Sequence, residues 1–143
     1  MKYGVLVERF GVPDITVDEL MTENPVTVTK NTMIRELVSL FKEHDFHAFP
    51  VVEDEELKGV VTKTDLVNEI DENGLEEFME KEVGEICSEN LITVKHDANV
   101  MDATDLLIKQ GHRFVPIVDE NELVGVLSYN DIAKRLMKTV PTK

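Results

Sequence analysis

The sequence lacks several features that mark particular classes of protein. It has no tryptophan and one cysteine, Cys87, so an intramolecular disulfide and a zinc site made of several cysteines are both excluded. A reducing compartment is the default for such a chain. No apolar run approaches the roughly 18 residues of a membrane span, and the N-terminus has no cleavage site typical of a secretory signal. We therefore expect a cytoplasmic protein without membrane association.

Positive charge is scarce. The chain has 15 lysines and arginines against 29 aspartates and glutamates, which gives a formal net charge of −14. Nucleic acids and anionic membrane surfaces are bound through clustered Lys and Arg, so this charge disfavours non-specific binding to either. The arginines are Arg9, Arg35, Arg113 and Arg135. In so acidic a chain, each of them is a candidate for a specific role.

Motifs of common enzymes and metal sites are also missing. The four histidines, His44, His47, His96 and His112, have neither HxxH nor HExxH spacing, so they do not predict a metal site. No serine lies in a nucleophile elbow, and no glycine-rich Walker loop is present. We expect no catalytic residue, no metal ligand and no enzymatic activity.

What the chain does contain is a repeat. A shift of 66 positions places Val17–Ile70 over Val83–Leu136 without a gap, and 14 of the 54 pairs are identical. A repeat present only twice is not a solenoid. It predicts two similar halves packed about a pseudo-two-fold axis, with ligand clefts at the seam. Because a half of this size has only a marginal core of its own, we expect one shared core.

The expected organisation follows from the repeat. It consists of an N-terminal extension (1–16), a first repeat (17–70), a connector (71–82), a second repeat (83–137) and a tail (138–143). The apolar residues Val5, Leu6, Val7 and Phe10 predict that the extension docks on this chain or a neighbour. In the connector, Asn73–Gly74 predicts a turn, and Leu75, Phe78 and Met79 predict a short packed helix.

Each repeat predicts the element order β-α-β-β-α, and therefore an α/β fold. Short strands are expected at Val26–Thr29 and Ile92–Lys95, each followed by an amphipathic helix. Asn31 and Asp97 are in range to cap these helices, and Gly111 to end the second. Buried hairpin strands are expected at Ala48–Val52, Leu57–Val61, Phe114–Val118 and Leu123–Leu127. The last helices are expected at Thr64–Ile70 and Asn130–Met137.

A hydroxyl and a carboxylate recur where the last strand of each repeat meets the last helix. Thr62 and Ser128 end the strands, and Asp65 and Asp131 follow three residues later. In a structural interpretation, these side chains cap the helix. In a functional interpretation, the hydroxyl and the free N–H groups of the helix hold a phosphate, while the carboxylate accepts hydrogen bonds from ribose hydroxyls. Local chemistry leaves both interpretations open.

The second candidate pattern is Gly111–Ile117, GHRFVPI. Arg113 has a planar donor group suited to phosphate oxygens, and His112 adds a donor or a switchable charge. The alternative is a solvated turn. The first repeat has His47 in place of Arg113 and Phe46 in place of His112. If two clefts exist, we expect the one that receives His112 and Arg113 to hold phosphate better.

Together these motifs resemble a tandem pair of cystathionine β-synthase (CBS) domains, also called a Bateman module. The resemblance rests on the β-α-β-β-α order, the opening MTENPVTV, the strand FPVV and the ending GxxTxxD, with their counterparts in the second repeat. The pair His112–Arg113 is similar to the phosphate-contacting His-Arg of the γ subunit of AMP-activated kinase. The resemblance covers about 120 of the 143 residues.

The resemblance implies a sensor that binds an adenosine-containing ligand between its repeats and signals to a protein partner, with AMP, ADP or ATP as regulatory ligand and no other cofactor. The implied site residues are Thr62, Asp65, Ser128 and Asp131 for ribose or phosphate, His112 and Arg113 for phosphate, backbone groups of Val26, Thr27, Ile92 and Thr93 for adenine, and the neighbouring His47 and Pro116. A homodimer is implied as well. The alternatives are a CBS pair for S-adenosylmethionine or NAD, and a ligand-free dimerisation module.

Overall fold

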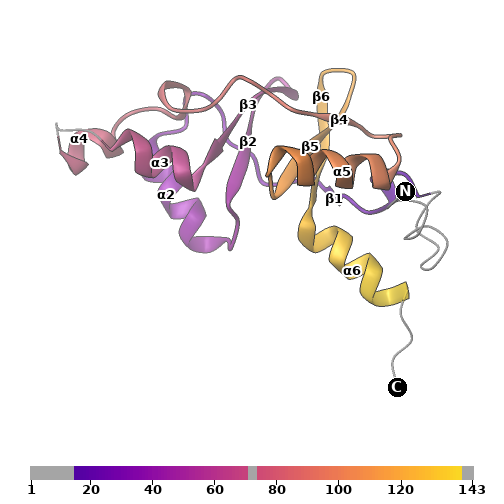
Figure 1. Ribbon diagram of the computed structural model, residues 1–143. Helices are drawn as coiled ribbons and strands as arrows, with labels where there is room; N and C mark the ends of the chain where they lie inside the picture. Colours follow the sequence, from indigo (N-terminus) through magenta and orange to yellow (C-terminus); the bar gives the residue numbers. More distant parts are fainter. Residues whose placement is uncertain (1–14, 71–73, 140–143) are drawn as a thin grey trace. The chain divides into compact units, whose positions relative to one another are not determined.

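The chain divides into two compact units (Figure 1), and the computed structural model describes residues 15–70 and 74–139. The first-repeat unit is Val26–Leu91. The second-repeat unit combines Met1–Pro25 with Ile92–Lys143. The predicted docking of Val5–Phe10 and the turn at Asn73 lie outside the described residues.

The first-repeat unit is an antiparallel hairpin with helices. Its elements are α2 (Ile34–Glu43), β2 (Ala48–Glu53), β3 (Glu56–Thr62), α3 (Lys63–Glu69), α4 (Leu75–Met79) and the 3-10 turn η2 (Val83–Glu85). Strands β2 and β3 pair with Phe49 opposite Val61. Both side chains are buried, because directly opposite residues of an antiparallel pair lie on the same face of the sheet. The predicted hairpin and connector helix are confirmed, and Phe78 of α4 is buried.

The second-repeat unit has the corresponding elements. They are η1 (Val17–Glu19), β1 (Thr22–Glu23), β4 (Val94–Lys95), α5 (Val100–Gln110), β5 (Phe114–Asp119), β6 (Glu122–Ser128) and α6 (Tyr129–Thr139). Strand β4 runs parallel to β5, while β5–β6 and β6–β1 are antiparallel. Gly111 ends α5 with φ of 69°, as predicted, because glycine adopts the left-handed conformation without strain. The predicted mixed α/β fold with two repeats is confirmed.

Three local predictions are wrong. The segment Val26–Thr29 forms a single bridge, between Val28 and Val51, instead of a strand. Asn31 does not cap α2, which begins after Met33 and has no side-chain cap. Asp97 does not cap α5, because Asn99 takes that position and its side chain accepts a hydrogen bond from the Met101 N–H at 2.7 Å.

The first segment of each repeat packs in the unit of the other repeat. Thr22 pairs with Val126 of β6, and its repeat counterpart Ser88 pairs with Val60 of β3. The residues just before each exchanged segment also supply a hydrogen-bond acceptor for the first N–H groups of each long helix. The Ile34 N–H donates to the Lys81 carbonyl at 2.8 Å, and the equivalent Val100 N–H donates to Ile15 at 2.9 Å. A backbone acceptor therefore meets one of the N–H groups that a helix start leaves unpaired.

Each unit has its own hydrophobic cluster. Val17 of η1 is buried with Val100, Ile117 and Leu127 in the second-repeat unit. Val83 of η2 is buried with Ile34, Phe49 and Val61 in the first-repeat unit. Each repeat extends its core with the first segment of the other, which offsets the small size of a single repeat.

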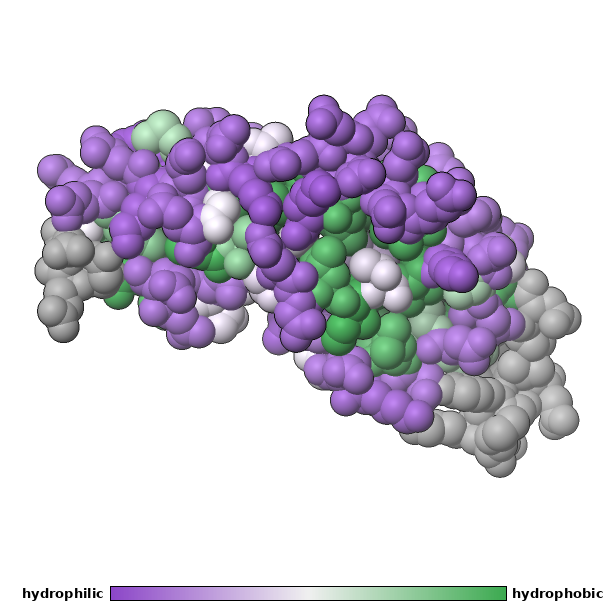
Figure 2. Space-filling view, turned by 90° about the horizontal axis from the view of Figure 1, so that it is seen from above, coloured by the Kyte–Doolittle hydropathy of each residue, from purple (hydrophilic) through white to green (hydrophobic). Residues whose placement is uncertain are grey.

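Hydrophilic side chains predominate on one face of the molecule. Figure 2 shows hydrophilic residues over most of the face toward the viewer, with a smaller group of hydrophobic side chains among them. Among the described residues, no polar or charged residue is buried. In the same part of the chain, no helix has the length and apolar character needed to cross a membrane.

The exchange depends on two glycines, and this generates a prediction. A Cβ on Gly125 would lie 2.8 Å from the Thr22 carbonyl oxygen, and a Cβ on Gly59 would lie 2.7 Å from that of Ser88. We expect Gly59→Ala and Gly125→Ala each to lower the free energy of unfolding by about 1–3 kcal/mol, because the paired backbone must shift. Urea unfolding of both variants measures this. Wild-type stability in both variants would contradict the exchanged packing.

Candidate functional site

The start of α6 carries the hydroxyl–carboxylate pair of the second repeat. The Asp131 Oδ2 atom accepts hydrogen bonds from the Ser128 N–H at 2.9 Å and from the Ser128 hydroxyl at 3.1 Å. In return, the Asp131 N–H donates to Ser128 Oγ at 3.3 Å. The pair forms a reciprocal cap that holds both side chains at the point where β6 ends.

The start of α3 repeats this arrangement. The Thr62 N–H donates to Asp65 Oδ2 at 2.8 Å, and the Asp65 N–H donates to Thr62 Oγ1 at 2.9 Å. The capping interpretation is therefore confirmed in both repeats. It is compatible with ligand binding, because the cap uses Oδ2 of each aspartate, and each carboxylate oxygen can accept more than one hydrogen bond. All four side chains are half-buried, which leaves them partly open to a ligand.

Thr22 is a site residue that the sequence did not identify. Its hydroxyl donates to Asp131 Oδ1 at 3.2 Å. The contact follows from the exchange, since pairing of β1 with β6 brings Thr22 beside the start of α6. The sequence does show a hydroxyl residue at the same position of both repeats, Thr22 and Ser88. It does not show which unit each of these residues packs in.

Arg113 lies next to the cap in the second-repeat unit. The Tyr129 N–H, in the first turn of α6, donates to the Arg113 carbonyl at 3.1 Å, and Phe114 lies opposite Ser128 in the sheet. Arg113 and His112 are both exposed. The equivalent bond in the other unit joins the Lys63 N–H to the His47 carbonyl at 3.0 Å. The structure thus brings the two predicted motifs of each repeat together.

The remaining predicted residues are divided in their accessibility. Pro116 is buried in β5, opposite Val126, so its side chain belongs to the packed sheet. Ile92 packs against the core of its unit, whereas Thr93 is exposed. Val26 and Thr27 are half-buried in the first-repeat unit. The expected contact with adenine uses the backbone groups of these four residues, not their side chains.

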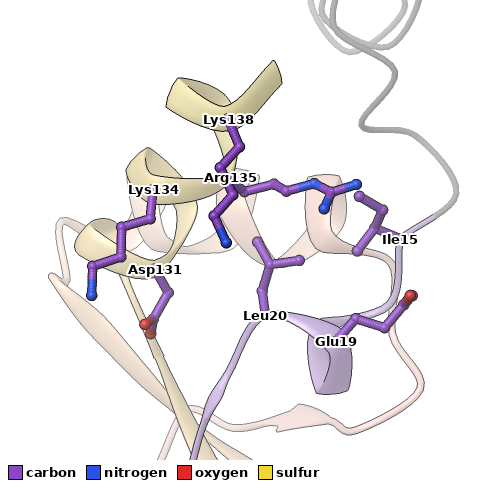
Figure 3. Close-up of a pocket in the computed structure, with 7 residues that line it drawn as sticks. All are labelled: Ile15, Glu19, Leu20, Asp131, Lys134, Arg135 and Lys138. Carbon is purple, nitrogen blue, oxygen red and sulfur yellow. The ribbon is translucent and has the colours of Figure 1, made fainter. Parts of the chain in front are cut away.

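A pocket of about 250 Å³ lies between α6 and η1 in the second-repeat unit (Figure 3). Arg135 and Lys138 extend near Leu20, with Asp131 and Lys134 at one end and Ile15 and Glu19 at the other. Sequence reasoning missed this pocket. A signal was present, because the repeat counterparts of Lys134 and Arg135 are Asn68 and Glu69.

His96 and Cys87, the other side chains that could carry chemistry, lie outside the candidate site. His96 Nδ1 lies 3.4 Å from Asp18 Oδ2, and Nε2 lies 3.8 Å from Asp119 Oδ1. The Thr16 hydroxyl bond, and then His96, lower the pKa of Asp18. Burial raises the pKa of the Cys87 thiol and disfavours the reactive thiolate. No group of three or more His, Cys, Asp or Glu in the described residues is arranged to hold a metal ion.

Comparison with known proteins agrees with the repeat and the fold. The CBS domain model matches residues 17–72 and 83–138. An uncharacterized protein of Methanocaldococcus jannaschii, MJ0188, is 34% identical over 131 residues, 90% of this chain and 47% of its own length. The CBS domain-containing protein YhcV of Bacillus subtilis is 34% identical over 122 residues, 85% of this chain and 86% of its own. The chain thus spans about half the length of some matched relatives, and CBS domains also occur within enzymes.

Two solved structures contain adenosine compounds. CBSX2 in complex with AMP has a TM-score of 0.76 and 28% identity, over 86% of this chain and 96% of that one. The CBS domain pair of MJ0100, in complex with 5-methylthioadenosine and S-adenosyl-L-methionine, has a TM-score of 0.75 and 25% identity, over 90% of this chain and 100% of that one.

The two caps generate a stability prediction that is independent of any ligand. We expect Thr62→Ala and Ser128→Ala each to lower the free energy of unfolding by about 1 kcal/mol, because the N-terminal N–H groups of α3 and α6 lose an acceptor. Thr64→Ala is the control, since Thr64 is exposed in the first turn of α3. Denaturant titration compares the three variants. Equal stability of all three would mean that the hydroxyls do not cap these helices.

Proposed function

The chain belongs to the CBS domain family and carries two CBS domains in tandem, and from this premise we propose that it is a regulatory module that binds an adenosine-containing ligand. The proposed primary site is at the start of α6. The observation that carries the proposal is the joining of the Ser128–Asp131 cap to the backbone of Arg113 through Tyr129. The backbone of Arg113 and the Asp131 carboxylate thus lie at the same helix start, which supports a site that combines a ribose acceptor with a cation suited to phosphate.

The proposed roles are divided among the residues of the second-repeat unit. Asp131 accepts from the ribose hydroxyls, and Ser128 lies near ribose or phosphate. Arg113 and His112 contact the phosphate, while backbone groups of Ile92 and Thr93 bind the adenine. The AMP complex of CBSX2 supports a nucleotide as the ligand. We assign no catalytic step, because binding and release alone transmit the state of the ligand to a partner.

The first-repeat unit is the weaker phosphate site in this proposal. Thr62 and Asp65 have the same cap, and Val26 and Thr27 correspond to the adenine-binding positions. However, His47 stands where the second repeat has Arg113. The S-adenosylmethionine and methylthioadenosine complex of MJ0100 supports an adenosine compound without phosphate as the second candidate ligand for this unit.

Assembly is the other part of the proposal. Val67 is 69% exposed on α3, Ile70 at its end is 50% exposed, and Met137 on α6 is 65% exposed. Apolar side chains on helix surfaces favour contact with another protein surface. A second copy of the chain is the proposed partner for these helices, in addition to a protein that the ligand state regulates.

A ligand panel tests the function. We expect at least one of AMP, ADP, ATP, S-adenosylmethionine and NAD to stabilise the protein, by about 2.7 kcal/mol at 100 times its dissociation constant. Thermal unfolding with each compound measures the stabilisation, and calorimetric titration confirms binding. If none of them stabilises or binds, a ligand-free dimerisation module becomes the better interpretation.

Two variants test the residue roles. Removal of one charge-assisted contact costs about 1.5–3 kcal/mol, or about tenfold or more in affinity. We therefore expect Arg113→Ala to weaken AMP binding while adenosine binding stays unchanged. Asp131→Asn should weaken both, because both ligands have the ribose diol. Arg35→Ala, on α2 of the other unit, is the control for lost positive charge. Unchanged AMP affinity in Arg113→Ala would refute the phosphate assignment.

A further inference from the structure

The Thr22 hydroxyl takes up an acceptor position of Asp131, the proposed ribose ligand. It donates to Asp131 Oδ1 at 3.2 Å. The other oxygen, Oδ2, accepts from the Ser128 N–H at 2.9 Å and from the Ser128 hydroxyl at 3.1 Å. A carboxylate offers about four acceptor positions, two on each oxygen. Within the described residues, three of these positions on Asp131 are therefore in use, and one on Oδ1 is open.

A ribose diol needs two acceptor positions when both of its hydroxyls donate to the same carboxylate. Asp131 offers one position while the Thr22 bond is in place, and two when the Thr22 hydroxyl turns away. Thr22 is exposed, so water can replace Asp131 as the partner of its hydroxyl. The second ribose hydroxyl can therefore take the position of Thr22, but only by breaking a bond within the protein.

The first-repeat unit has a different arrangement. Asp65 Oδ2 accepts from the Thr62 N–H at 2.8 Å. Ser88, the counterpart of Thr22, pairs with Val60 through its backbone, but among the described residues its hydroxyl makes no bond to Asp65. Asp65 can therefore accept from two hydroxyls without the loss of a bond. The two carboxylates differ in what a ribose has to displace.

We propose that Thr22 is a positioning residue that competes with the ribose for Asp131, so that a ribonucleotide bound in the second-repeat unit releases the Thr22 hydroxyl. This inference rests on the proposed function. The Thr22 hydroxyl orients the carboxylate through Oδ1 until the second ribose hydroxyl takes its place. The release occurs in β1, after which the chain enters the first-repeat unit at Val26. The segment that completes the sheet of this unit is thus the part that responds to the ligand.

The test measures how much the second ribose hydroxyl adds to binding with and without the Thr22 hydroxyl. Calorimetry gives the affinities of the full chain for AMP, 2′-deoxy-AMP and 3′-deoxy-AMP, in the wild type and in Thr22→Val. A deoxy ligand needs one acceptor position and leaves the Thr22 bond intact. AMP gains a bond in Thr22→Val without breaking one. We therefore expect its affinity to rise about twofold to tenfold in this variant, with both deoxy affinities unchanged.

Two further variants are matched controls. Thr22→Ser keeps the hydroxyl donor and should restore the wild-type ratio of AMP to deoxy-AMP affinity. Ser88→Ala removes the counterpart hydroxyl of the first repeat and should leave all three affinities unchanged. Thermal unfolding without ligand checks that the variants fold, and valine suits the exposed strand position of Thr22 because it favours strands.

A purely structural role for Thr22 predicts a different result, since a damaged site would bind all three ligands more weakly. If Thr22→Val weakens them alike, or keeps the wild-type ratio of AMP to deoxy-AMP affinity, the competition is refuted, while AMP binding by the wild type leaves the proposed function standing. If none of the three binds the wild type, the competition is refuted as well, and the ligand panel decides the proposed function separately.

Discussion

Both units depend on backbone pairing between the first segment of one repeat and the last strand of the other, β6 or β3. Thr22 reaches Val126 and Ser88 reaches Val60, and each contact requires a glycine in the strand, Gly125 or Gly59. The exchanged segments also bury Val17 and Val83 in the two cores. In the second-repeat unit, the same pairing brings the Thr22 hydroxyl to Asp131. The geometry that completes the core therefore also builds the candidate site.

The two units share this framework and differ in charge. In both units, a hydroxyl and an aspartate cap the helix that follows the hairpin, α3 after β3 and α6 after β6. The second-repeat unit has Arg113 beside the cap where the first repeat has His47, and its α6 has Lys134 and Arg135 where α3 has Asn68 and Glu69. Capping is a requirement of the fold, so it is kept in both repeats. Positive charge at these positions is not required by the fold, and its presence there in one repeat alone favours a role in binding.

Much of the fold was predictable because the responsible signals are local. Short continuous apolar runs bounded by turns predicted both hairpins, and Gly111 predicted the end of α5. The cap of α2 was not predictable from local sequence, because the Ile34 N–H bonds to the distant Lys81 carbonyl. The packing of each first segment in the unit of the other repeat was not predictable either. The first segments of the two repeats are similar, so their sequence does not indicate which repeat each will join.

The candidate site was predictable in part for the same reason. Ser128, Asp131 and Arg113 belong to motifs that are contiguous in the chain, and β5–β6 pairing joins them. Thr22, Ile15 and Leu20 come from the exchanged segment, so their contribution required the tertiary structure. Lys134 and Arg135 were visible as a charge reversal between the repeats, but their convergence on a pocket depends on the position of η1.

The two repeats are alike in fold, and we propose that they are unequal in phosphate binding. The stoichiometry of AMP binding to the full chain, measured by equilibrium dialysis over a wide concentration range, tests it most directly. We expect one tight site per chain, with any second site about tenfold or more weaker, since one Arg–phosphate contact is worth about 1.5–3 kcal/mol. Two sites of equal affinity would contradict it.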